Sequence, residues 1–144
     1  MKYIKEITPK ECNDGLKKYF EVATVDDFWE VKGMYAMEGD KCYQSLDGNV
    51  YFLCQNGSSN FVYFALEPGK MSNIRATYEV LYELVCEGVP FLRVNGKDGR
   101  YGHFLNHFGH YTQVNSAIPE HEEFIWYIGH PDTVRQIRLR IGRN

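Results

Sequence analysis

Long apolar runs are missing from this sequence, and so is any surplus of basic residues. The longest apolar stretch falls far short of the ~20 residues that a membrane-spanning helix needs. Sixteen Lys and Arg stand against nineteen Asp and Glu, which gives a formal net charge of −3. Nucleic-acid binding and membrane-surface binding both depend on a basic field, so we expect neither a nucleic acid nor a membrane as a partner.

Closely spaced cysteines are missing as well. The four cysteines are scattered and form no C-x-x-C motif. Cys54 and Cys86 stand inside apolar runs, so both are predicted to be small, buried hydrophobic residues in a reducing compartment. Met1 is followed by charged residues and not by the apolar segment of a secretory signal. Together these features predict a cytoplasmic protein.

No low-complexity linker and no internal repeat divides the chain. We therefore expect a single domain over residues 1–144, which is enough chain for one hydrophobic core without metal or disulfide support. Hydrophobic residues make up 44% of the sequence and aromatic residues 15%. The aromatic excess favours a β-sheet or a large interface.

The first third of the chain begins with strand and helix patterns. Residues 2–8 alternate as an edge strand does, and a proline then opens a predicted helix over 9–20. A second helix is predicted over 26–37. Turn residues follow at 38–40 and at 47–49.

The strongest strand patterns come next. Two β-rich runs, 49–55 and 61–66, flank an Asn-Gly turn and predict a hairpin. Apolar residues at helical spacing then predict a long helix, capped by Ser72 or Asn73 and ending at Gly88.

The rest of the chain adds three strands and a short helix. The strands are predicted over 90–95, 110–115 and 123–128, and the helix over 100–108. Residues beyond Pro131 do not decide between helix and strand. A strand–helix–strand unit within a mostly antiparallel sheet implies one parallel pair, joined by a right-handed crossover.

This order of elements resembles the GNAT family of acyl-CoA-dependent N-acyltransferases. The most telling segment is residues 100–114 (RYGHFLNHFGHYTQV), where Phe104, Phe108, Gly109 and Tyr111 provide an aromatic-x-x-x-Gly-aromatic phrase like that of the family. The resemblance implies an α+β fold, with a GNAT-like mixed, mostly antiparallel twisted sheet flanked by helices. It also implies transfer of an acyl group to an amine on a small molecule or a protein.

The resemblance implies acetyl-CoA or another acyl-CoA as cofactor, bound where residues 61–88 resemble the family's fourth strand, turn and long helix. The N–H groups and the positive end of that helix favour phosphate oxygens. The turn departs from the family because it has a single glycine and an acidic Glu67. The positive charges of Lys70 and Arg75 offset the negative charge of Glu67 in part. The implied cofactor-binding residues are Leu66, Gly69, Lys70, Met71, Ser72, Asn73 and Arg75.

The implied catalytic groups lie in the second half of the chain. The family's usual general acid aligns with Leu105, so Tyr101, one turn earlier, is the candidate to protonate the leaving thiolate. His103 or His107 is a candidate base for the acceptor amine. Glu122 lies in an acidic loop that either attracts a cationic amine or is simply solvated.

Three histidines at positions 103, 107 and 110 have a spacing that would suit a metal on a continuous helix. Gly109 is expected to end that helix before His110, and no H-E-x-x-H motif is present. We therefore predict partly exposed surface histidines and no metal, and a metal-dependent hydrolase built on these histidines is a third possible function.

Aromatic residues on both faces of neighbouring strands leave a second class of function open. Tyr51, Tyr63 and Trp126 are candidates for a surface that contacts a protein partner or forms a homo-oligomer. The alternative is a non-catalytic bacteriophage protein with a GNAT-like fold, acting as a virion component or as an inhibitor that binds a host protein. Its location would then be the host cytoplasm or the virion.

Overall fold

The structure is a computed structural model that describes residues 2–22, 36–55, 60–65, 71–95, 107–114 and 123–142. It is a mixed α+β structure in which the described residues form three helices and seven strands. Contacts within the chain define two compact units. The first comprises Met1–Asn56 and Val62–Val80, and the second comprises Gly57–Phe61 and Leu81–Asn144.

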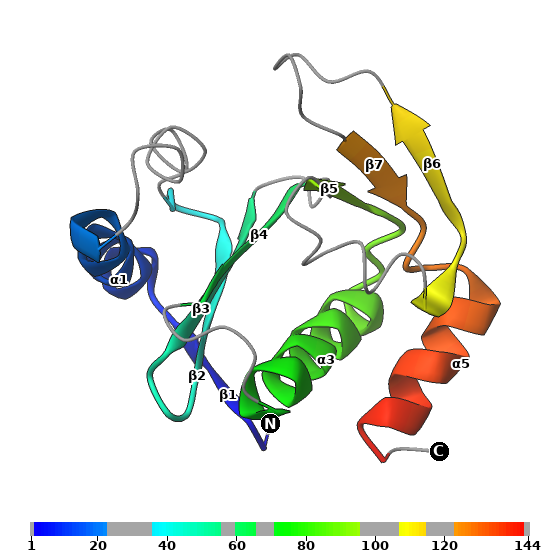
Figure 1. The fold of residues 1–144 in the computed structure, drawn as a ribbon, viewed down its shortest axis with the longest axis horizontal. Coiled ribbons are helices and arrows are strands. Elements are labelled where there is room, and N and C mark those ends of the chain that lie inside the picture. The colour runs from blue at the N-terminus through cyan, green and yellow to red at the C-terminus, as the bar shows by residue number, and fades with distance from the viewer. Residues whose placement is uncertain are drawn as a thin grey trace. The chain divides into compact units, whose positions relative to one another are not determined.

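The first unit is built on consecutive antiparallel strands (Figure 1). β1 (Ile4–Ile7) pairs with β2 (Lys41–Ser45), and β2 pairs with β3 (Val50–Gln55). β4 (Asn60–Ala65) follows β3 as its neighbour. The predicted edge strand at the start of the chain is confirmed as β1, and both predicted strands of the hairpin are present as β3 and β4.

Helix α1 (Pro9–Val22) begins with a capping box. The Glu11 amide donates to Thr8 Oγ1 at 3.1 Å, and the Thr8 amide donates to Glu11 Oε1 at 3.2 Å. These reciprocal bonds satisfy N–H groups that the first turn of a helix leaves without partners. The helix predicted over 9–20 is thus confirmed, with Thr8 as the residue that fixes its start.

Strand β3 is buried on both faces. Every residue from Val50 to Cys54 is buried, and Phe52 and Leu53 are fully so. Successive side chains of a strand point to opposite faces, so both faces must be covered. Figure 1 shows α1 and the first part of α3 on opposite sides of these strands. The continuous apolar run of β3 reflects this two-sided burial.

The long helix α3 (Met71–Cys86) ends in a Schellman motif. The Gly88 amide donates to the Val85 carbonyl at 3.0 Å, and the Val89 amide to the Leu84 carbonyl at 3.1 Å. Gly88 has a φ of +84°, a left-handed conformation that glycine adopts without strain. The predicted C-terminal glycine is confirmed. The start is corrected, because Ser72 and Asn73 lie inside the helix and do not precede it.

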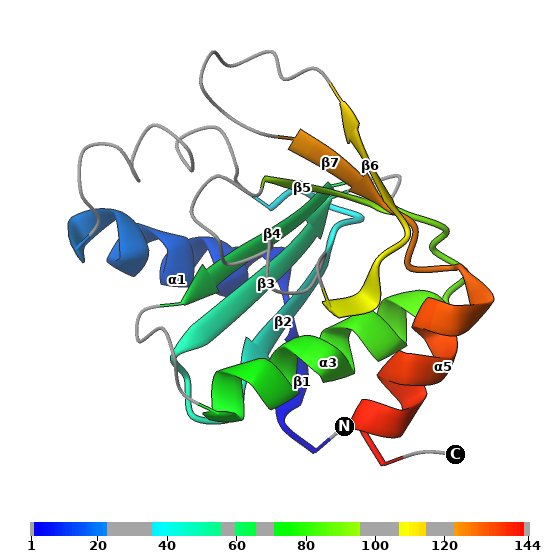
Figure 2. The ribbon, with the colours of Figure 1, turned by 45° about the vertical axis from the view of Figure 1, so that its right-hand side comes forward.

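The second unit has β7 (Glu123–Trp126) between β5 (Leu92–Asn95) and β6 (Tyr111–Val114), antiparallel to both (Figure 2). Asn60 of β4 pairs with Arg93 of β5 in parallel, as the strand–helix–strand prediction required. Trp126 is buried and stacks on Phe108, with ring centroids 5.6 Å apart.

The tail, whose pattern was ambiguous, is helix α5 (Pro131–Arg140). Proline is well suited to the first helical position, where its missing N–H costs nothing. Thr133 and Ile137, one turn apart, are fully buried and face the core of the second unit. Arg135, Arg138 and Arg140 therefore belong to a helix.

Strand β2 was not predicted, although the turns on both sides of it were. Its sequence, KCYQS, has only two apolar residues and no clear alternation. The strand exists because its backbone is hydrogen-bonded along both edges, to β1 and to β3. Of the helix predicted over 26–37, residues 36 and 37 are not helical, and the others lie outside the described residues.

We expect Gly15→Ala to destabilise the protein although alanine is the better helix former by ~1 kcal/mol. A Cβ on Gly15 would lie 2.3 Å from two atoms of the Tyr51 ring, which is itself buried. Overpacking of this kind costs about 1–3 kcal/mol. Urea denaturation measures the change, with the exposed helical position Asp14→Ala as control. Equal or greater stability of Gly15→Ala would contradict this packing.

We also expect the capping box to make stability depend on pH. The backbone and side-chain hydrogen bonds from Thr8 hold the pKa of Glu11 below its usual value. This group therefore stabilises the fold above the ordinary pKa of a glutamate, and the stabilisation is lost as the pH falls through the lowered value. Thermal melts should show a lower Tm for Glu11→Gln at neutral pH and a converging Tm in acid. A gap that is constant with pH would contradict the assignment.

Candidate functional site

The residues predicted to bind acyl-CoA are only partly described. Leu66, Gly69 and Lys70 lie outside the described residues. Met71, Ser72 and Asn73 form the first turn of α3. The first four N–H groups of an α-helix have no partner within the helix, so this turn offers donors to an anion.

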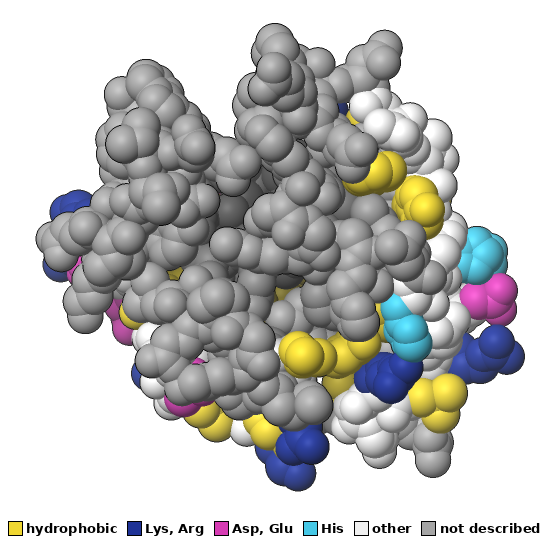
Figure 3. All heavy atoms as spheres, viewed as in Figure 1, with side chains coloured by type: hydrophobic (Ala, Val, Ile, Leu, Met, Phe, Trp, Pro, Cys, Tyr) yellow, Lys and Arg dark blue, Asp and Glu magenta, His cyan; other side chains and the backbone are white. Residues whose placement is uncertain are grey.

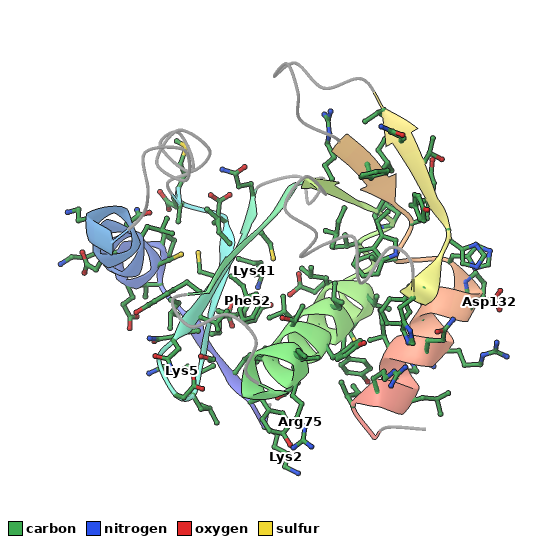
Figure 4. All side chains as sticks on the ribbon, viewed as in Figure 1. Lys2, Lys5, Lys41, Phe52, Arg75 and Asp132 are labelled. Carbon is green, nitrogen blue, oxygen red and sulfur yellow. The ribbon has the colours of Figure 1, made fainter. Side chains whose placement is uncertain are left out.

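Arg75 is directed at the beginning of the chain (Figure 4). Its Nη1 donates to Tyr3 Oη at 3.0 Å, and its guanidinium carbon lies 5.5 Å from the centroid of the Tyr3 ring. The Arg75 guanidinium would have to leave Tyr3 to reach a bound phosphate. Its role as a phosphate partner stays a prediction.

Glu79, one turn further along α3, holds the same segment. It is buried, and its carboxylate accepts the backbone N–H groups of Lys2 and Tyr3, with the Lys2 bonds at 2.7 Å. A buried carboxylate needs such donors, because an uncompensated charge in the protein interior is costly. Arg75 and Glu79 therefore hydrogen-bond α3 to residues 2 and 3 at the start of the chain.

Of the predicted catalytic residues, the structure describes His107. Tyr101, His103 and Glu122 lie outside the described residues. His107 lies against Arg140 of α5, with Nε2 as the contact atom. Arginine only donates, so His107 accepts through Nε2. To act as a base, His107 would have to exchange this bond for one to the amine.

His107 and His110 do not share a helical face. Gly109, between them, has a φ of +68°, and His110 itself has a φ of +59°. Residues 107 and 108 are helical and residues 109 and 110 are not, so the predicted end of the helix before His110 is confirmed. His107 lies near Arg140, whereas the His110 ring stacks on the His130 ring with centroids 3.6 Å apart.

His110, His130 and Asp132 form a cluster that was not predicted from the sequence. Asp132 Oδ2 lies 3.5 Å from His110 Nε2 and 3.9 Å from His130 Nδ1. The side chains of His110, His130 and Asp132 are 35%, 40% and 51% exposed. In Figure 3 a histidine, an acidic and a basic side chain lie together at the right-hand edge of the surface, and Figure 4 labels Asp132 there. We call His110, His130 and Asp132 the histidine–aspartate cluster.

The cluster is also the start of α5. His130 is the N-cap, and its Nδ1 accepts the Asp132 backbone N–H at 3.2 Å. Its sequence signal was the His-Pro-Asp tripeptide at positions 130–132, which places a polar cap before a proline and an acidic first turn. No local sequence signal predicted that His110 would join the cluster, because His110 lies twenty residues before His130 in the sequence.

Three of the four cysteines are buried, but Cys86 is exposed, which corrects the prediction for that residue. A hydrogen bond with Cys42 lowers the pKa of the Cys12 thiol, and the same bond and burial raise the pKa of Cys42. Both side chains are almost fully buried. A nucleophile needs access to its substrate, so we assign these thiols to packing.

The predicted aromatic surface is largely wrong. Tyr51 and Trp126 are 8% and 1% exposed, so both belong to the core. Tyr63 lies in β4. Among the aromatic residues whose burial the structure describes, the exposed ones are instead Tyr111 and Tyr127, at 41% and 40%.

No protein-family model matches this chain, and a search of curated proteins finds no match either. In the described part of the chain, none of the helices is both long enough and apolar enough to cross a membrane.

We expect His130→Ala to destabilise the protein by about 1 kcal/mol, because the start of α5 loses its cap. His130→Ser should retain most of that stability, since a serine hydroxyl also accepts an N–H at this position. Urea denaturation of the two variants measures the difference. Equal losses in both variants would show that the stacked imidazole, and not the cap, supplies the stability.

Proposed function

We propose that this protein is an acyl-CoA-dependent N-acyltransferase of the GNAT type. One observation carries the proposal: the order and pairing of its elements. The described chain runs through a strand, a helix, three strands, a long helix, three more strands and a final helix. Asn60 and Arg93, on either side of the long helix in sequence, form a parallel pair. A long helix between two parallel strands supports the resemblance to the GNAT family.

The start of α3 supports the choice of cofactor. Met71, Ser72 and Asn73 lie in the first turn of a 16-residue helix, whose N-terminal N–H groups and positive dipole suit a pyrophosphate. Leu66, Gly69 and Lys70 precede this turn in sequence and complete the proposed cofactor-binding segment. Acetyl-CoA or another acyl-CoA supplies an activated thioester when bound.

The protein then has to position an amine and move two protons. A base removes a proton from the acceptor amine, and an acid protonates the leaving thiolate. We propose His103 or His107 as this base and Tyr101 as the acid. Glu122 is proposed to attract the cationic amine. For His107, the Nε2 atom that accepts from Arg140 is the ring atom that would receive the proton of the amine.

The test is acetyl-CoA binding to the purified protein, measured by calorimetry and by thermal shift at saturating ligand. Micromolar binding would raise the Tm by mass action. Ser72→Glu or Asn73→Glu should weaken binding by about tenfold or more, a change of ~1.4 kcal/mol, because a carboxylate there repels the phosphates. An acidic residue in the first turn is favourable for the helix itself, so the fold should survive.

Ser72→Ala is the matched control, because it removes the hydroxyl without adding a charge, and it should bind nearly as well as the native protein. No binding at millimolar acetyl-CoA would overturn the proposal. Equal binding by the native protein and both glutamate variants would place the cofactor elsewhere and overturn the assigned site.

A non-catalytic binding protein of bacteriophage origin is the second candidate. It is favoured by β6, which pairs with β7 alone among the described strands and has Tyr111, Thr112 and Gln113 exposed. Tyr127 lies beside this strand, with its Oη 3.4 Å from Thr112 Oγ1. An open strand edge with aromatic residues suits a protein partner or a second copy. This role predicts protein binding that Ser72→Glu leaves intact.

A further inference from the structure

We propose that His110, His130 and Asp132 form a binding site for a divalent transition-metal ion, with Zn²⁺ as the reference ion. The site shares only His110 with the metal interpretation of residues 103, 107 and 110, because it combines the segment before β6 with the start of α5. It is also independent of acyl-CoA binding, so either proposal can fail without the other.

The donor atoms already lie at the spacing of metal ligands. One donor atom from each of the three side chains lies within 4.8 Å of the other two. Two ligands of a tetrahedral zinc ion, each bound at about 2.0–2.1 Å, lie roughly 3.3 Å apart. Asp132 Oδ2 and His110 Nε2, at 3.5 Å, are close to that separation, and His130 Nδ1 is little further at 3.9 Å.

The backbones of His110 and His130 are both hydrogen-bonded to the backbone of Tyr127. The Tyr127 amide donates to the His110 carbonyl at 2.9 Å, and the His130 amide donates to the Tyr127 carbonyl at 3.1 Å. His110 adopts a left-handed conformation, which histidine tolerates better than most residues. Two ligands held in this way lose little backbone freedom when they bind an ion.

The carboxylate of Asp132 is oriented by a second contact. Its Oδ1 lies 3.5 Å from Arg135 Nη2, whereas its Oδ2 faces the two histidines. Contacts of this kind position metal ligands and affect affinity in many metal sites. The positive end of the α5 dipole and Arg135 both oppose a cation, so the single charge of Asp132 is needed to offset them.

Metal binding must compete with the cap of α5. A neutral imidazole has one nitrogen with a free lone pair, and His130 uses Nδ1 to accept the Asp132 N–H. The two rings are also nearly parallel, with 12° between their planes, so their lone pairs do not converge. One ring has to rotate. The side chains are 35% and 40% exposed, which leaves room for that rotation.

The donor set selects the class of metal. Two imidazole nitrogens and one carboxylate oxygen suit Zn²⁺, Co²⁺, Ni²⁺ or Cu²⁺, whereas Mg²⁺ and Ca²⁺ prefer oxygen ligands. Three protein ligands leave a coordination position for water or another small ligand.

The test is calorimetric titration of the full chain with Zn²⁺, in a Cys86→Ser background that removes the exposed thiol as a competing ligand. We expect one ion per chain and no binding of Mg²⁺. His110→Ala and Asp132→Asn should each weaken Zn²⁺ binding by at least about tenfold. His130→Ser should do the same while keeping a cap on α5, and thermal melts confirm that each variant is folded.

His107→Ala is the matched control, because that histidine lies against Arg140 and outside the cluster, so Zn²⁺ affinity should not change. Co²⁺ adds a second readout, since its visible spectrum separates nitrogen and oxygen ligands from thiolates. The proposal is overturned if millimolar Zn²⁺ gives no binding, if affinity survives all three cluster substitutions, or if the Co²⁺ spectrum shows thiolate ligation.

Discussion

Most of this structure depends on one constraint. A central strand needs hydrogen-bond partners along both edges, and its apolar side chains must be buried on both faces. In the first unit, β2 is hydrogen-bonded to β1 and β3, and β3 is buried from Val50 to Cys54. Helix α1 can cover this strand closely because Gly15 has no side chain where the Tyr51 ring lies. In the second unit, β7 has the same position between β5 and β6, with Trp126 as its buried anchor.

Helix α3 has two different ends, and the N-terminal one matters for the proposed activity. Its C-terminal end is closed by the Schellman bonds of Gly88 and Val89. Its N-terminal turn provides the donors proposed to bind a pyrophosphate. One and two turns further along, Arg75 and Glu79 hold Tyr3, so the helix is tied to the beginning of the chain close to the proposed cofactor turn. Cofactor binding and the placement of residues 2 and 3 are therefore expected to influence one another.

The histidines of the second unit are used in different ways. His107 accepts from Arg140, and His130 caps α5 while it stacks on His110. An imidazole nitrogen that accepts a hydrogen bond is also the atom that would receive a proton or bind a metal ion. The proposed base and the proposed metal site thus draw on the same property of histidine, at two places held apart by the turn at Gly109. In each case the new ligand must replace a hydrogen bond that already exists.

The sequence by itself determined the elements whose signals are local: the proline start of α1, the apolar run of β3, the Gly88 end of α3 and the strand–helix–strand crossover. It also determined that Gly109 ends a helix before His110. Tertiary structure alone decided β2, whose residues have no strand pattern and which exists through pairing with two neighbours. It also decided the burial of Tyr51 and Trp126 and the exposure of Cys86, because alternation does not tell which face a helix will cover. The histidine–aspartate cluster belongs to the same class, since it requires His110 and His130, twenty residues apart, to be hydrogen-bonded to the same Tyr127 backbone.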